Sequence, residues 1–181
     1  MKKPTTFPAI DHKLELVQEA QHKYSTFTQE QVNIIFKEAA MAANEARLPL
    51  AVQAVEETGM GIVVDKVVKN HFASEIIYHK YHDLKTCGVV ESDPLSGYEK
   101  VAKPIGIVAG FTPVTNPTST AVFKALICLL TRNGFIVESR KMHHRGAAHR
   151  ARCRSKSWGA QKHHQLGERI DHREIPVPDA A

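Results

Sequence analysis

The stretch from Lys103 to Thr120, KPIGIVAGFTPVTNPTST, limits what this chain can fold into more than any other part of its sequence. Pro104 to Phe111 is apolar and contains β-branched residues, which predicts a short buried strand. The polar residues Thr112 to Thr120 predict a loop, and Ala121 to Leu130 predicts an apolar helix. A buried strand, a loop and a helix N-terminus form the geometry at which α/β proteins hold phosphates and reacting groups. The same form is also typical of an ordinary connection between a strand and a helix.

Several helices are predicted before this stretch. Asp11 to Tyr24 has the apolar spacing of a first helix. Thr28 and Gln31 match a capping box, in which the threonine hydroxyl and the glutamine side chain each satisfy a free backbone N–H, so a second helix is expected to begin there. Pro49 is expected in the first turn of a third helix, and Gly59 is expected to close it, because glycine readily adopts the left-handed conformation found there.

A fourth helix is predicted to begin at Asp65, with that carboxylate as its N-terminal cap. The apolar residues expected along its buried side are Val67, Val68, Phe72, Ile76, Ile77 and Leu84. Together these segments predict a helical layer that precedes the strands.

Turn-forming residues divide the rest of the chain after Cys87. Glu91 to Gly97 is predicted to be a loop, and Tyr98 to Ala102 an edge strand. The Asn133–Gly134 pair indicates a turn, after which Phe135 to Val137 begins another strand. Helices followed by strand, loop, helix and strand predict an α/β fold, with an N-terminal helical layer and an incomplete Rossmann-like nucleotide-binding sheet.

Charge divides the chain into two parts. The formal net charge is +5, yet residues 1–139 carry 14 Lys and Arg against 15 Asp and Glu. Residues 140–181 carry 10 against 4, together with six of the 11 histidines. Apolar residues in this tail are few and show no period. We therefore predict a partial domain at 1–139 and a disordered tail at 140–181.

The cysteines and the N-terminus indicate a compartment. Cys87, Cys128 and Cys153 show no paired spacing, and the lysines at the N-terminus are not followed by the apolar segment of a secretory signal. No apolar run approaches the length of a membrane span. We therefore expect reduced thiols and a cytoplasmic location.

Four segments carry a resemblance to a known family. GIVAGFTPVTNPTSTAVFKALI resembles the aldehyde dehydrogenase superfamily, most closely the CoA-acylating domain at the front of bifunctional aldehyde-alcohol dehydrogenases. FTQEQVNIIFKEAAMAANEARLPLA, EETGMGIVVDKVVKNHFASEIIYHKYHDLKTCGV and LTRNG resemble the same branch. The resemblance runs from about Lys13 to about Phe135 and then stops.

The resemblance implies thioester chemistry for the full-length relatives. In that chemistry a cysteine thiolate attacks an aldehyde, hydride passes to NAD and CoA takes the acyl group, which interconverts acetaldehyde and acetyl-CoA. The reaction passes through an oxyanion that needs preorganised donors. The motif VTNPTS implies that the Asn116 amide is one of them. From its local sequence alone, an asparagine before a proline also fits an Asx turn.

The same resemblance implies the cofactor and the assembly. The residues expected to line the nicotinamide end of NAD are Phe111, Thr112, Pro113, Val114, Thr115 and Asn116. The family forms homo-oligomers, so this chain is expected to come from an oligomeric enzyme. The sequence has no GxGxxG motif in this segment, and Glu-Ser-Arg at 138–140 stands where the family continues into a loop of the Ser-Pro-His-Pro type.

The nucleophilic cysteine of the family has no counterpart in this sequence. Cys87 matches a structural cysteine of the family. Cys128 is expected on the apolar face of a helix, as a buried thiol of the protein core, and Cys153 has no matching context. We therefore expect a fragment of a fermentative, CoA-acylating acetaldehyde dehydrogenase that is inactive alone.

The abrupt end of the resemblance suggests that the chain is read out of frame from near residues 136–140. Shifted codons for Trp158 to Gly167 permit a peptide like that of the family, although codon degeneracy allows it rather than requires it. The histidine pairs at 143–144 and 163–164 lack flanking ligands at zinc-finger spacing, so no metal site is predicted.

Two other classes of function remain open. The basic tail could contact the phosphates of a nucleic acid, although it lacks interleaved aromatics and a known reader fold. The helical arm could instead join the subunits of an intact relative and interfere with them. If the chain is an enzyme fragment, its unfinished sheet is expected to leave Ile105, Ile107, Val122 and Phe123 without partners, which predicts poor solubility and aggregation.

Overall fold

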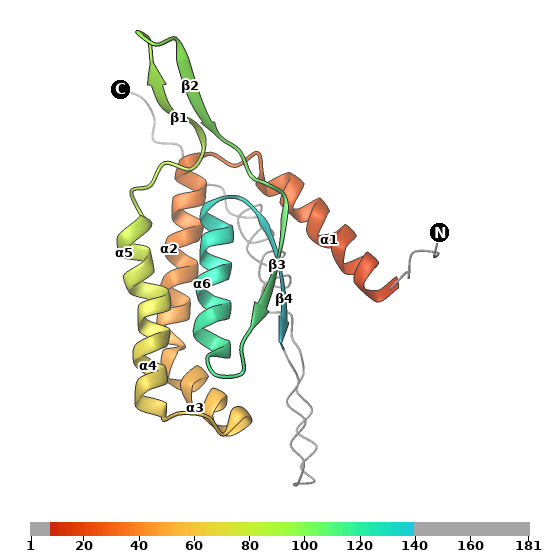
Figure 1. Cartoon of the computed structure of the whole chain (residues 1–181), viewed down its shortest axis with the longest axis vertical. Coiled ribbons are helices and arrows are strands. Elements are labelled where there is room, and N and C mark those ends of the chain that lie inside the picture. The colour runs from red at the N-terminus through yellow and green to blue at the C-terminus, as the bar shows by residue number, and fades with distance from the viewer. Residues whose placement is uncertain (1–7, 140–181) are drawn as a thin grey trace, which may run out of the picture.

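The computed structural model describes residues 8–139, in which helices surround a short pair of parallel strands (Figure 1). The N-terminal half is helical. Its elements are α1 (Pro8–Tyr24), α2 (Gln29–Glu45), α3 (Arg47–Thr58), α4 (Val63–His71), the π-helical turn η1 (Phe72–Ile76) and α5 (Ile77–Tyr81). The elements that follow are β1 (Gly88–Asp93), β2 (Tyr98–Ala102), β3 (Ile107–Thr112), α6 (Pro117–Leu130) and β4 (Gly134–Ser139).

The strands form two separate pairs. β1 and β2 make an antiparallel hairpin that projects from one end of the molecule (Figure 1). β3 and β4 run parallel, from Ile107 opposite Gly134 to Thr112 opposite Ser139, and α6 is the crossover between them. α1 packs against the β3–β4 pair, while α6 packs between that pair and α2. The predicted α/β order, with helices first and a partial sheet after them, is confirmed.

The core lies where α6 meets α2. Phe36 and Val32 of α2 are fully buried, as are Leu126 and Leu130 of α6. Burying a side chain of this size contributes about 1.5–3 kcal/mol. Small residues on α2, such as Ala40, let the two helices approach closely.

Two helix boundaries follow the sequence signals. Thr28 caps α2 as predicted: its backbone N–H donates to Gln31 Oε1 at 3.0 Å, and the Gln31 N–H donates to Thr28 Oγ1 at 3.4 Å. Gly59 closes α3 with a left-handed φ of 64°. Pro49 is the third residue of α3, within its first turn as expected.

Three predicted boundaries are wrong. α4 begins at Val63 after Ile62, so Asp65 lies inside its first turn and does not cap it. β1 extends through Asp93, because that side chain accepts hydrogen bonds from the Leu95 and Ser96 N–H groups and closes a tight turn in place of a longer loop. α6 begins at Pro117 rather than Ala121, since proline is well suited to the first position of a helix.

The predicted buried face of the fourth helix is right for Ile77 but wrong for Val68, Phe72, Ile76 and Leu84, which are exposed. The continuous helix of α4, η1 and α5 buries Lys66, Asn70, Ala73, Ser74 and Ile77. Its exposed stripe, spaced every four residues, consists of Val64, Val68, Phe72 and Ile76. The outward face is therefore apolar, and most of the inward face toward α6 is polar or small.

The unfinished sheet leaves apolar surface open, as expected, but not at every predicted position. Ile105 is 85% exposed and Phe123 is 40% exposed. Val122 is only 4% exposed, because it faces the core, and Ile107 is half-buried. The predicted disorder and altered reading frame of 140–181 lie outside the described residues.

The LTRNG segment ties β4 to distant parts of the chain. Arg132 is buried and has a left-handed φ of 56°. Its guanidinium donates to the Ser25 carbonyl at 2.7 Å and to the Ala102 carbonyl at 3.2 Å. Asn133 Oδ1 accepts hydrogen bonds from the Ile105 and Gly106 N–H groups at 2.7 and 3.0 Å, which fixes the start of β3.

Within 8–139, no helix is long and apolar enough to cross a bilayer.

Candidate active-site loop

The candidate site is the loop that joins β3 to α6. β3 ends at Thr112 and α6 begins at Pro117, so residues 113–116 connect the carboxyl end of a parallel strand to a helix N-terminus. Asn116 is the N-terminal cap residue of α6, with φ −142° and ψ 61°, yet its side chain makes no capping hydrogen bond. The side chain is therefore not used to satisfy the backbone of its own helix.

The Asn116 amide is held from one side only. Its Oδ1 accepts a hydrogen bond from Lys69 Nζ at 3.2 Å, across from α4. Among residues 8–139, Nδ2 has no hydrogen-bond partner. The two Nδ2 hydrogens are thus available to another acceptor.

A groove of about 560 Å³ opens beside this amide. Its apolar walls are Val68 and Phe72 of the exposed stripe and Phe123 of α6. Asn116, with Ser119 and Thr120, supplies polar groups at the N-terminal end of α6. An apolar groove that ends at a few polar groups is typical of a small-molecule site.

Three lysines donate hydrogen bonds to the segment from Phe111 to Asn116. Lys66 Nζ donates to the Thr115 carbonyl at 2.7 Å, and Lys124 Nζ donates to the Phe111 carbonyl at 2.7 Å. Lys69 makes the third bond, to Asn116. Within the described part of the chain, none of the three has a carboxylate oxygen within 4.0 Å.

Lys66 is unusual because it is buried. Only 4% of the residue is exposed, and its loss of water lowers the pKa of the ammonium, with the charge of Lys69 adding to the effect. One turn later Asn70 is 1% exposed. Asn70 Oδ1 accepts from the Thr118 hydroxyl at 2.8 Å, and its Nδ2 donates to the Arg47 carbonyl at 3.0 Å.

Sequence reasoning missed Lys66 and Asn70, because a lysine and an asparagine on a helix are normally expected in solvent. One signal was available. Lys66, Asn70 and Ser74 recur every four residues and so share one helix face. From the sequence alone, either the polar or the apolar stripe of this helix could face the interior. Only the position of α6 decides which of the two is buried.

The predicted nicotinamide-side residues are consecutive and lie at the end of β3 and in the loop that follows it. Phe111 is 71% exposed at the end of β3. Pro113 and Thr115 are exposed and Val114 is half-buried. Thr112 differs from the others, since it is buried and its hydroxyl lies 3.5 Å from the Glu138 carbonyl of β4. The Thr112 side chain is therefore not presented at the surface of the loop.

Neither described thiol is placed to attack a substrate beside Asn116. Cys128 is buried, as predicted, and burial raises the pKa of its thiol to about 11. It lies 12 residues along α6 from Asn116, about 18 Å at the helical rise. Cys87 is half-buried and follows Thr86, whose hydroxyl donates to the Leu130 carbonyl at the end of α6 away from the loop.

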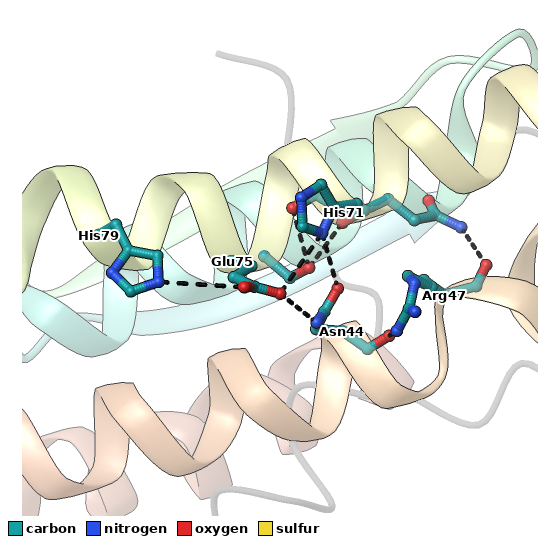
Figure 2. A network of polar contacts seen from close by, with 7 residues as sticks. Asn44, Arg47, His71, Glu75 and His79 are labelled. Carbon is teal, nitrogen blue, oxygen red and sulfur yellow. Dashed lines mark hydrogen bonds and ion pairs between the residues drawn. The ribbon is translucent and has the colours of Figure 1, made fainter.

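A separate polar cluster joins α2 and α3 to the long helix. Figure 2 shows Glu75 between His71 and His79, facing Asn44 of α2. Asn44 Nδ2 donates to Glu75, Asn44 Oδ1 accepts from His71 Nδ1 at 3.1 Å, and Arg47 Nη1 donates to the Asn44 carbonyl at 2.9 Å. The hydrogen bonds of this cluster link α2 to His71 of α4 and Glu75 of η1. In the described ranges, no three histidine, cysteine or acidic residues are arranged to hold a metal ion.

Comparisons with known proteins show which proteins the chain resembles. No family profile matches the chain. An aldehyde-alcohol dehydrogenase of Clostridium acetobutylicum is 58% identical over 132 residues, which is 73% of this chain and 15% of that protein. The bifunctional aldehyde-alcohol dehydrogenase of Escherichia coli K12 is 57% identical over the same share. A succinate-semialdehyde dehydrogenase (acetylating) of Clostridium kluyveri is 36% identical and is covered over 31% of its length.

Solved structures give the same result. An acetylating aldehyde dehydrogenase from Geobacillus thermoglucosidasius matches with a TM-score of 0.72 and 41% identity, over 73% of this chain and 29% of that one. A propionaldehyde dehydrogenase from Rhodopseudomonas palustris, solved with bound CoA and an acylated cysteine, matches with a TM-score of 0.55 and 26% identity, over 72% of this chain and 30% of that one.

The fold of residues 8–139 thus matches part of the acetylating aldehyde dehydrogenases to which they are compared. More particularly, this chain is homologous to the acylating aldehyde dehydrogenase region of the bifunctional aldehyde-alcohol dehydrogenases. The family resemblance expected from the sequence is confirmed. The chain spans about 15% of the length of these bifunctional relatives.

Proposed function

We propose that this chain supplies the oxyanion-binding loop of an NAD-dependent, CoA-acylating aldehyde dehydrogenase. In the full-length enzyme the reaction would convert acetaldehyde, CoA and NAD⁺ to acetyl-CoA, NADH and a proton, and its reverse. The observation that carries the proposal is the Asn116 amide, whose Nδ2 has no hydrogen-bond partner among the described residues and lies at the edge of an apolar groove.

Each part of the loop has a role in this proposal. Asn116 Nδ2 would donate to the oxygen of the reacting carbonyl, where negative charge develops as a nucleophile adds. An uncharged amide suits this task, because it donates without competing for a proton. Phe72 and Phe123 would hold the short apolar chain of the aldehyde.

The residues from Phe111 to Thr115 fit the nicotinamide end of NAD. Phe111 presents an exposed ring at the end of a parallel strand, next to the N-terminus of α6, which is where dinucleotides bind in related α/β folds. Thr112 would take part through its backbone alone. When bound, NAD supplies the acceptor for the hydride.

The proposal includes a lack of turnover by this chain alone. Forming a thioester requires a thiolate close to the carbonyl, and the burial of Cys128 keeps that group protonated. The purified full chain, incubated with acetaldehyde, CoA and NAD⁺, should produce no NADH above a buffer blank at 340 nm, the usual NADH absorbance. Turnover that scales with protein concentration would contradict this part of the proposal.

A chimera tests the positive part. Residues 8–139 of this chain would replace the matching segment of the Clostridium acetobutylicum relative, which is 58% identical. We expect the chimera to retain CoA-dependent aldehyde oxidation. Asn116→Ala in the chimera should lower kcat by about 10²–10³ with little change in KM, the usual effect of removing an oxyanion donor.

The matched control is Asn133→Ala, an asparagine of the same chain that bonds the backbone of β3 away from the groove. We expect it to lower thermal stability but to leave kcat of the folded chimera within about threefold. An Asn116→Ala chimera with unchanged kcat would overturn the oxyanion assignment.

The division of the chain at 139 and a cytoplasmic location are also part of the proposal. The unpaired thiols of Cys87 and Cys128 support a reducing compartment. Resequencing the encoding DNA tests the altered frame: a confirmed read with no family-like peptide in the neighbouring frame after codon 139 would refute it.

A further inference from the structure

α4 is turned so that its polar face meets the candidate loop. Lys66 and Asn70 point inward and are 4% and 1% exposed, whereas Val64 and Val68 are 69% and 62% exposed. A helix that follows the hydrophobic effect alone would sit the other way round. The inward polar groups must therefore make contacts that offset the loss of water.

The contact made by Lys66 falls on the residue before Asn116. An ammonium loses several kcal/mol of hydration when it is buried, and a full carboxylate partner is the usual compensation. Within 8–139, Lys66 instead donates to the Thr115 carbonyl at 2.7 Å. A charged donor makes a stronger bond to a carbonyl than a neutral one does, so the peptide between Thr115 and Asn116 is held firmly.

Two neighbouring contacts hold the other sides of Asn116. Lys69 Nζ donates a hydrogen bond to Asn116 Oδ1. This bond orients the amide so that Nδ2 is the group without a partner among the described residues. Asn70 Oδ1 accepts a hydrogen bond from the Thr118 hydroxyl in the first turn of α6. The backbone before Asn116, its side chain and the helix turn after it are thus each bonded to α4.

We infer that Lys66 is a positioning residue for the Asn116 oxyanion donor, and that Lys69 orients the same amide. Lys66 fixes the backbone from which the amide projects, and Lys69 selects which end of the amide is free. This inference rests on the proposed function of Asn116. Neither lysine touches the reacting atoms.

Hydrogen exchange of the full chain, read by mass spectrometry, tests the backbone half. The Thr120 N–H bonds the Asn116 carbonyl at 3.3 Å, so it reports whether the start of α6 is held. Lys66→Met should raise exchange in peptides covering 117–121 at least tenfold and leave α2 peptides unchanged. Lys69→Met should leave both unchanged, as should the control Lys80→Met on the exposed side of α5.

Uniformly faster exchange in Lys66→Met would mean that Lys66 supports the whole fold, and unchanged exchange at 117–121 would mean that it does not hold the loop. Either result overturns the inference. If Lys66→Met does not fold, Lys66→Gln keeps a shorter donor, and the same two readings apply to it.

A double-mutant cycle in the chimera tests the link to Asn116. Lys66→Met and Lys69→Met should each lower kcat about tenfold or more at nearly constant KM. In an Asn116→Ala background each should lower kcat less than threefold, because the group they position is gone. If the effects of the lysine and Asn116 substitutions on kcat are fully additive, the inference is wrong, while the assignment of Asn116 stands. If Asn116→Ala does not change kcat, the proposed function itself is wrong.

Discussion

At the scale of single residues, the β3–β4 pair depends on close approach between backbone and ring. A Cβ added at Gly110 would lie 2.4 Å from Phe135 Cε2 and 2.8 Å from its Cζ. Phe135 is only 2% exposed, so its ring is enclosed by neighbouring groups. Glycine is therefore needed at 110 for packing rather than for an unusual backbone angle.

Gly110→Ala is expected to lower the free energy of unfolding by about 1–3 kcal/mol, the range for overpacking a dense core. The measurement is the urea midpoint of the full chain followed by circular dichroism. Ala109→Val, at the exposed neighbouring position of the same strand, serves as the control and should change the midpoint little. An unchanged midpoint in Gly110→Ala would show that the ring can move aside.

The buried thiol of Cys128 should make stability depend on alkaline pH. Burial raises its pKa from 9.0 to about 11 in the folded state, so the folded state favours the protonated form. The stability it contributes is complete below pH 9 and is lost as the pH rises toward 11, to a total of about 2–3 kcal/mol.

Cys128→Ala should remove this part of the pH dependence, measured as the free energy of unfolding at pH values from 8 to about 10.5. Cys87→Ala, which removes the half-buried thiol, should keep it. If the Cys128→Ala chain loses stability as steeply as the wild type above pH 9, another group is responsible.

At the scale of elements, α4 combines a polar inner face with an apolar outer stripe. The outer residues Val64, Val68, Phe72 and Ile76 are 41–69% exposed. Apolar surface of this kind promotes association of chains in solution. We therefore expect this stripe, together with Ile105, which is 85% exposed, to contribute to the poor solubility that the sequence predicts.

The double substitution Val64→Gln/Val68→Gln is expected to raise the concentration at which the chain remains monomeric, with little change in the urea midpoint. Static light scattering gives the first quantity and circular dichroism the second. Ile77→Gln on the buried face, where 5% of the residue is exposed, should instead cost about 2–5 kcal/mol. Equal destabilisation by both changes would mean that the stripe is packed in solution.

Elements with a local signal were predictable, and those set by distant contacts were not. The Thr28 cap and the Gly59 helix end depend on residues adjacent in the chain, so the sequence revealed both. The facing of α4 depends on the bond between Lys66 and Thr115, which lie 49 positions apart. Likewise the position of Asn116 in a strand–loop–helix was evident, but its partners on α4 became visible only with the fold.

At the scale of the whole molecule, Arg132 joins parts of the chain that are remote in sequence. Its guanidinium bonds carbonyls of Ser25 and Phe27 beyond α1 and of Ala102 at the end of β2. Because the residue is only 8% exposed, these bonds are shielded from water. α1 and the hairpin are thus both attached to the turn before β4.

Arg132→Met is expected to lower the free energy of unfolding by about 3–5 kcal/mol, since three partly buried carbonyls would lose a charged donor. Chemical denaturation of the full chain measures the loss. Lys103→Met, on the exposed segment between β2 and β3, is the matched control and should be nearly neutral. A loss below about 1 kcal/mol would mean that water replaces the arginine.

The π turn η1 has a consequence for how much change the long helix can absorb. This turn contains one more residue than a turn of α-helix would. It lies between α4, which bonds the candidate loop, and α5, whose Tyr78 contacts Phe36. Deleting a single residue from 72–76 would return this turn to α-helical hydrogen bonding and leave the residues after it facing the same way relative to Lys66. Tyr78 would then still meet Phe36 while Lys66 kept its carbonyl, so this short turn absorbs one residue without changing which neighbours the two parts of the helix contact.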